Sequence, residues 1–197
     1  MADQHKVPDR RKLFGEMALQ VISHGGLRAL THRSVDEAAG LPTGSVNYYA
    51  PTRSKLYALA MAEVYHQMYE IATRAFGPIL ADGSDRSPGP ILDCTTAFVM
   101  AMSTEGREIS NARCALLVES QFDDVLREQV TTNRTAFIAF TEPFVRAQAP
   151  GSPERTAELI VALIDGLIQQ QTLVTASNFH RAMIRTTISR IFGFSEN

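Results

Sequence analysis

Strand-like alternation, long apolar runs and cysteine are all scarce in this chain of 197 residues. No run approaches the roughly 18 apolar residues of a membrane-spanning helix, and the N-terminus lacks the apolar segment of a secretory signal. The two cysteines, Cys94 and Cys114, lie in apolar stretches, so we expect buried, reduced thiols. Without a cluster of histidines they cannot form a zinc site of the usual kind. These absences predict a cytoplasmic protein without a membrane partner, metal or cofactor.

The net charge of −2 hides an uneven distribution of charged residues. Residues 1–60 carry a net charge of +3 and include all three lysines, whereas the rest of the chain carries −5. No acidic residue occurs between Glu37 and Glu63. A basic N-terminal part with a long acid-free stretch is suited to contact with phosphate groups.

Helical periodicity runs through nearly the whole chain, which predicts an all-α fold of about nine or ten helices. Turn signals such as Gly25-Gly26 and Gly77-Pro78 divide it. Thr31 or Ser34 can cap the short helix that follows Gly26, and Ser34 to Glu37 has the pattern of a capping box. The expected helices are a long first one ending at Gly25, then 32–39, 43–50, 52–77, two between 90 and 122, 123–147, 154–175 and 179–192.

Two of the expected helices, 32–39 and 43–50, are short and are joined by a tight turn that contains Gly40. The small residues Ala38 and Ala39 allow them to pack closely, which is the layout of a helix-turn-helix. The second helix fits a major groove about 12 Å wide and carries hydrogen-bonding side chains. This pattern predicts a DNA-binding element.

Residues 8–60 resemble the DNA-binding domain of the TetR family of transcriptional regulators. The matching residues, in order and spacing, are Thr31, Ala39-Gly40-Leu41, Gly44-Ser45, Tyr48-Tyr49, Pro51 and Leu56. The resemblance implies a homodimer that binds double-stranded operator DNA and responds to a small-molecule effector. The candidate DNA-binding residues are Thr31, Arg33, Thr43, Gly44, Ser45, Asn47, Tyr48, Tyr49, Arg53 and Lys55.

Three positions depart from the usual residues of that family. Pro42 stands in place of Ser, Asn47 in place of Tyr, and Ala50 in place of Phe. Asn47 either pairs with adenine in the major groove or faces solvent. The small Ala50 leaves space that Tyr49 or Tyr57 can fill.

We expect the DNA-binding domain to cover residues 1–55 and an effector-binding and dimerisation domain to cover 56–197. Residues 158–171 resemble the dimerisation helix of the family, and a phenylalanine-rich helix before them can complete half of an intermolecular four-helix bundle. Met-rich apolar side chains predict an adaptable pocket for a mainly apolar effector. The candidate dimer-interface residues are Phe137, Phe144, Ile160, Leu163 and Leu167. The candidate effector-binding residues are Met68, Phe98, Met102, Arg113, Leu117, Gln121 and Phe122.

The sequence therefore favours an effector-responsive repressor. A regulator that acts as an activator, or without a ligand, is the alternative within the same class. A helical enzyme is disfavoured, because the sequence has no nucleophile elbow, phosphate loop, paired carboxylates or histidine-centred cluster. A helical interaction module without DNA binding is a further alternative, which the departure at Ala50 keeps open.

Overall fold

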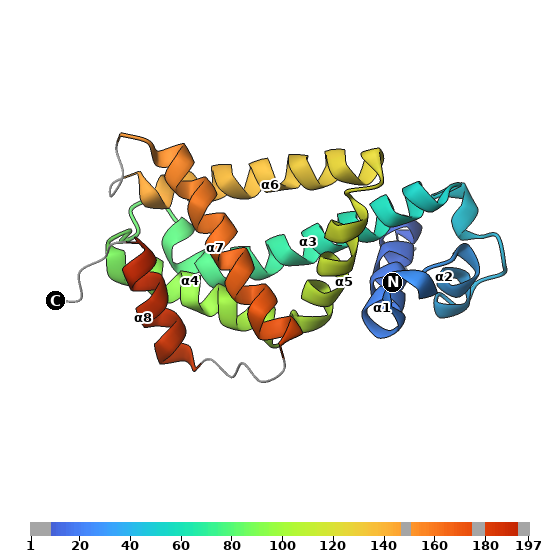
Figure 1. Cartoon of the computed structure of the whole chain (residues 1–197), viewed down its shortest axis with the longest axis horizontal. Helices are drawn as coiled ribbons and strands as arrows, with labels where there is room; N and C mark the ends of the chain where they lie inside the picture. Colours follow the sequence, from blue (N-terminus) through green and yellow to red (C-terminus); the bar gives the residue numbers. More distant parts are fainter. Residues whose placement is uncertain (1–8, 147–150, 175–179, 193–197) are drawn as a thin grey trace, which may run out of the picture. The chain divides into compact units, whose positions relative to one another are not determined.

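The computed structural model describes residues 9–146, 151–174 and 180–192. These residues form eight α-helices and one short 3₁₀ helix, with no strand among them, which confirms the predicted all-α fold (Figure 1). No helix in these ranges is both long and apolar enough to cross a membrane. The elements are α1 (Arg10–Ala29), α2 (His32–Ala38), η1 (Val46–Tyr48), α3 (Arg53–Leu80), α4 (Pro88–Ser103), α5 (Arg107–Glu119), α6 (Asp124–Val145), α7 (Pro153–Leu173) and α8 (Arg181–Phe192).

The chain divides into two compact units. The first contains the residues up to 66 together with 112–130, and the second contains 67–111 together with the residues from 131 onward. Helices α3, α5 and α6 each contribute residues to both units. The boundary expected between residues 55 and 56 falls inside α3, within the first unit.

The first unit is built on the packing of α1 against α2 and of α2 against η1. Phe14 and Ala18 of α1 and Val35 of α2 are fully buried. A Cβ atom added to Gly15 would lie 3.0 Å from the Cβ atom of Glu63, so α1 and α3 pass close to each other at this glycine. These apolar contacts hold the short elements that lack stability of their own.

Of the two predicted caps of α2, Thr31 and Ser34, the structure uses Thr31. Thr31 is the N-cap: its Oγ1 accepts a hydrogen bond from the Ser34 backbone N–H, and the Ser34 hydroxyl oxygen accepts one from the Thr31 backbone N–H. The predicted capping box from Ser34 to Glu37 is therefore wrong. Its pattern lies one turn too late, because α2 already begins at His32.

The long helix α3 begins as predicted and ends later. Its start is capped by Thr52, whose hydroxyl oxygen accepts a hydrogen bond from the Lys55 N–H at 3.2 Å. The predicted end at Gly77-Pro78 is wrong, because the helix continues to Leu80. Pro78 lies in the last turn of α3, and the helix reaches Leu80 despite the backbone hydrogen bond that proline cannot donate.

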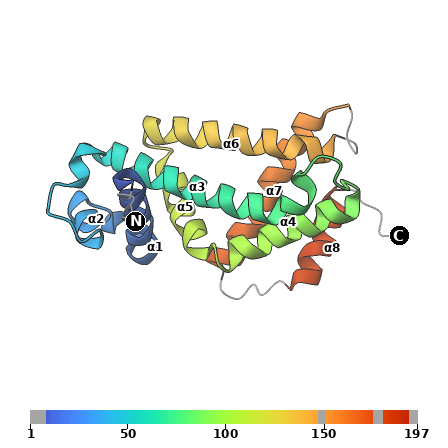
Figure 2. The same cartoon turned by 180° about the vertical axis from the view of Figure 1, so that it is seen from behind.

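In the second unit, α4 packs against both α7 and α8 (Figure 2). Four aromatic rings from α3, α4 and α6 form a cluster with centroid separations of 5.3 to 6.3 Å. The cluster consists of Phe76, Phe98, Phe140 and Phe144.

Cys94 of α4 is buried, and this burial, with a smaller effect of Asp93, raises the pKa of its thiol. Cys114 of α5 is half-buried, and neither cysteine forms a disulfide bond.

Candidate nucleic-acid interface

The residues predicted to enter the DNA groove form a short segment, residues 43–49, which we call the recognition segment. It contains a single 3₁₀ turn, Val46–Tyr48. The α-helix predicted over 43–50 is therefore wrong. Gly44 has a φ of +95°, which prevents a helix from starting at residue 43, and Pro51 follows directly after Ala50, so helical geometry is confined to residues 45–49.

The recognition segment is anchored by two inward-facing side chains and presents polar ones. Val46 is fully buried, and the ring of Tyr49 packs on Phe14 with centroids 5.4 Å apart. Tyr48 is 87% exposed, and its ring packs edge-on against the ring of Tyr49, with centroids 5.1 Å apart. Asn47 is exposed as well. The segment thus presents a large aromatic side chain and an amide to solvent.

Two residues of α2 that sequence reasoning missed bind the backbone of this region. The Asp36 carboxylate accepts hydrogen bonds from the N–H groups of Gly44, at 2.7 Å, and Val46, at 2.8 Å. The His32 ring bonds through Nε2 to the carbonyl oxygen of Ala50 at 2.6 Å. The sequence did contain one signal for this pair. His32 and Asp36 are four residues apart on one short helix, so their side chains lie on the same face and can contact the same neighbouring segment.

Several predicted DNA-binding side chains already have partners within the chain. The Thr31 side chain caps α2, and the Ser45 hydroxyl donates to the Pro42 carbonyl at 2.6 Å. Arg33 donates through Nε to the Glu37 carboxylate at 2.7 Å, and this contact raises the pKa of the guanidinium. The exposed Thr43 lies at the start of the recognition segment.

The start of α3 places two cations just after the recognition segment. Arg53 and Lys55 are both exposed. The Arg53 guanidinium lies over the Tyr57 ring, 5.3 Å from its centroid, and its Nε donates to the Tyr57 hydroxyl. Tyr57 and Ala50 are buried. Because Tyr57 orients Arg53, this cation is partly ordered before any phosphate approaches.

The residues predicted to bind an effector lie in different environments. Met68, Phe98 and Met102 belong to the second unit and are buried there. The other four lie on or just after α5, in the first unit: Arg113 is buried, Leu117 is half-buried, Gln121 is exposed and Phe122 is 83% exposed. Burial therefore does not support an enclosing role for Gln121 and Phe122.

The residues predicted at a dimer interface also divide by burial. Leu163 of α7 is exposed, and Leu167 is half-buried. Phe137 is half-buried and stacks on Tyr69, with centroids 4.3 Å apart. Ile160 and Phe144 are buried within the chain itself, which leaves them little surface to offer a partner.

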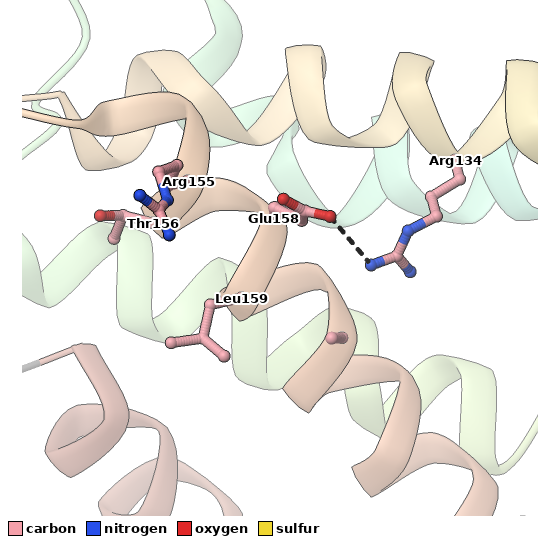
Figure 3. Close-up of a pocket in the computed structure, with 6 residues that line it drawn as sticks. Arg134, Arg155, Thr156, Glu158 and Leu159 are labelled. Carbon is pink, nitrogen blue, oxygen red and sulfur yellow. Dashed lines mark ion pairs between the residues drawn. The ribbon is translucent and has the colours of Figure 1, made fainter.

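Between α6 and α7 the surface is hollowed to a volume of about 510 Å³ (Figure 3). Arg134 on α6 reaches toward Glu158 on α7, and their charged atoms lie 4.0 Å apart. The lining residues of this α6–α7 hollow are Arg134, Arg155, Thr156, Glu158, Leu159 and Ala162.

Comparison with known proteins agrees with this architecture. A family model described as tetracyclin repressor-like, C-terminal domain, matches residues 86–193. A transcriptional regulator from Rhodococcus sp. Rha1 is 15% identical, with a TM-score of 0.73 over 93% of this chain and 94% of that one. A TetR-like transcriptional regulator from Rhodococcus sp. RHA1 is 12% identical, with a TM-score of 0.68 over 93% of both chains. The multidrug binding protein EbrR, complexed with imidazole, is 20% identical, with a TM-score of 0.68 over 93% of this chain and 95% of its own. No curated protein matches.

Proposed function

Because the chain belongs to the TetR family of transcriptional regulators, whose members are DNA-binding regulators and not enzymes, we propose that it is a repressor that binds operator DNA as a homodimer and releases it when a small molecule binds. The observation that carries the DNA-binding part is the recognition segment. It presents Asn47 and Tyr48 to solvent inside a stretch without acidic residues, directly before the exposed Arg53 and Lys55.

A salt titration tests this DNA-binding function. Cations that neutralise DNA phosphates release counterions, so the affinity for duplex DNA should fall linearly on a log–log plot against salt concentration. Binding to duplex DNA that does not weaken with salt, or no binding at all at low salt, would contradict the proposal.

Asn47 is the exposed side chain of the recognition segment whose amide can pair with a base. Replacing Asn47 by alanine is expected to cost about 1–3 kcal/mol on the preferred operator and to relax the preference at one base pair. Selection of bound duplexes by the variant, compared with the wild type, measures both effects. An unchanged selected sequence would show that Asn47 faces solvent in the complex.

We propose that the outer face of α7 forms the dimer contact. Leu159 is 61% exposed, and Ala162, Leu163 and Gly166 continue the same face at helical spacing. The opposite face of the helix is already used within the chain, since Ile160, among others, is buried. A helix with apolar side chains on both faces is suited to join its own core and a partner's.

The α6–α7 hollow borders this face and adds polar groups to it. Leu159 and Ala162 belong to both the hollow and the outer face of α7. Arg134, Arg155 and Glu158 surround the apolar side chains with charges of both signs (Figure 3). An apolar centre with a polar rim is the usual anatomy of a protein interface, and a two-fold axis would bring the same patch of a second copy against it.

We propose that the effector acts through α3. This single helix carries Arg53 and Lys55 near its start and Met68 in its second half, so a ligand that tilts it moves the DNA-binding residues. EbrR, a structure of similar fold, is a multidrug binding protein complexed with imidazole, which supports a small-molecule ligand here as well.

The buried Phe98 gives a test of the effector site. Phe98→Ala should change the response to apolar ligands and leave ligand-free operator affinity nearly intact, because Phe98 lies in the second unit, outside the DNA-binding element. Titrating apolar ligands against a labelled operator complex measures this response. By reciprocity the operator should weaken ligand binding by the same factor, typically about 5–150-fold. A ligand that binds free and DNA-bound protein equally well would contradict the mechanism.

A further inference from the structure

The carboxylate of Asp36 is buried inside the DNA-binding element. The residue is 1% exposed, and its two oxygens accept hydrogen bonds from the Gly44 and Val46 N–H groups of the recognition segment. These contacts join residues eight and ten positions apart in the sequence. Each oxygen takes one amide, so the carboxylate holds the beginning of the segment at two points.

His32 holds the other end. It lies four residues before Asp36 on α2, and its Nε2 contacts the carbonyl oxygen of Ala50, directly after the recognition segment. A carbonyl oxygen can only accept, so Nε2 carries the hydrogen in this contact. The backbone on both sides of Asn47 and Tyr48 is therefore bound by side chains of a single helix.

The recognition segment's own backbone bonds, such as those from the Asn47 N–H to the Gly44 carbonyl and from the Tyr49 N–H to the Val46 carbonyl, join residues only three positions apart, so bonds from α2 are needed to fix its place in the unit. Its only regular structure is the 3₁₀ turn, and a helix this short does not sustain itself in water. The Gly44 N–H lies at the start of the segment, where an N–H group has no partner within a helix, and the Asp36 carboxylate accepts its hydrogen bond. The direction in which Asn47 and Tyr48 project thus depends on α2.

We propose that His32 and Asp36 are positioning residues that clamp the recognition segment and so determine which operator sequence it accepts. This inference rests on the proposed DNA-binding function. It also assigns the Gly44 N–H to Asp36, so this amide is not available to a DNA phosphate. The negative charge of Asp36 by itself would repel DNA. The hydrogen bonds of Asp36 therefore favour operator binding, whereas its charge disfavours it.

Loss of the hydrogen bonds should lower the affinity for the operator, and loss of the charge should raise it. This difference allows a decisive comparison in the full-length protein. Asp36→Asn removes one negative charge and replaces one accepting oxygen by an amide that can only donate. Glu37→Gln removes the same charge from the adjacent residue, which contacts Arg33 and not the recognition segment. The probes are a duplex that the wild type selects from a random pool and an unrelated duplex of equal length.

The clamp predicts that Asp36→Asn weakens binding to the selected duplex about tenfold or more, since a buried amide loses its acceptor. Binding to the unrelated duplex should stay within about threefold, because it depends on phosphate contacts. Glu37→Gln should bind both duplexes at least as tightly as the wild type. If Asp36→Asn binds the selected duplex as tightly as Glu37→Gln does, the proposal is wrong.

His32 gives a second and independent pair of variants. Glutamine can place an N–H donor near the position of Nε2, whereas leucine fills similar space without a donor. His32→Gln should keep affinity for the selected duplex within about threefold, and His32→Leu should lose about tenfold. Equal losses in the two variants would overturn the clamping role of His32. This pair also decides the proposal if circular dichroism shows that Asp36→Asn is unfolded.

Amide hydrogen exchange without DNA separates this inference from the proposed function. In Asp36→Asn, the Gly44 and Val46 amides should exchange faster than in Glu37→Gln, while buried amides of α1 keep their protection. If the wild type selects no duplex, the proposed function fails, and this exchange measurement still decides whether the clamp exists. Equal exchange at Gly44 and Val46 in the two variants would overturn it.

Discussion

Replacing Leu163 by arginine is expected to convert the protein into a monomer and to lower its operator affinity by about 10²–10⁴-fold, the range that bivalent binding can supply. Leu163 is an exposed leucine on the outer face of α7, within the residues 159–166 proposed to meet a second copy. An arginine there would bury a charge without a partner in the proposed contact surface of each copy. Light scattering at micromolar concentration measures the first effect, and anisotropy of a labelled operator measures the second.

Val118→Arg is the matched control for this experiment. Val118 is also an exposed apolar residue, but it lies on α5 in the other unit. The Val118→Arg variant should remain a dimer, with an operator affinity within about threefold of the wild type, because surface substitutions away from special structural features change stability little. A Leu163→Arg variant that remains a dimer would show that this face of α7 does not form the dimer contact.

Replacing Phe14 by alanine is expected to lower the free energy of unfolding by about 3–5 kcal/mol, as is typical for a large aromatic residue in a packed core. Phe14 is fully buried on α1 and supports the ring of Tyr49 in the recognition segment. The cavity should therefore weaken both the fold and the placement of the DNA-contacting residues. Urea denaturation at a fixed protein concentration measures the loss of stability.

Phe122→Ala makes the same chemical change on the surface. Because Phe122 is 83% exposed, its removal should change the free energy of unfolding by less than about 0.5 kcal/mol. Similar losses in the two variants would contradict the burial on which the description of the first unit depends.

Local sequence signals predicted the all-α fold and the start of α3, because helix periodicity and caps such as Thr52 depend on neighbouring residues. The recognition segment was not predictable in the same way. Its conformation depends on hydrogen bonds to Asp36 from residues eight and ten positions further along the chain. Local sequence preferences do not predict contacts at that separation. The helix predicted over 43–50 could not start at residue 43, because Gly44 has a positive φ.

The surface of α7 shows a second limit of sequence reasoning. Apolar residues occur on both faces of this helix, and periodicity alone does not tell which face meets the chain's own core. The structure buries Ile160 and leaves Leu159 and Leu163 exposed. Similarly, Phe122 follows an apolar helix and was expected to line a pocket, yet it lies on the surface. Which side of an apolar stripe is covered depends on the packing of distant helices.

Selection of bound duplexes from a random pool by the wild-type protein tests the central claim most directly. A dimer with two recognition segments predicts a palindromic or nearly palindromic sequence. Its half-site centres should lie about 34–36 Å apart, or a multiple of one helical turn. Recovery of a single unrepeated half-site, or of no enriched sequence at all, would contradict the account of this chain as a dimeric operator-binding repressor.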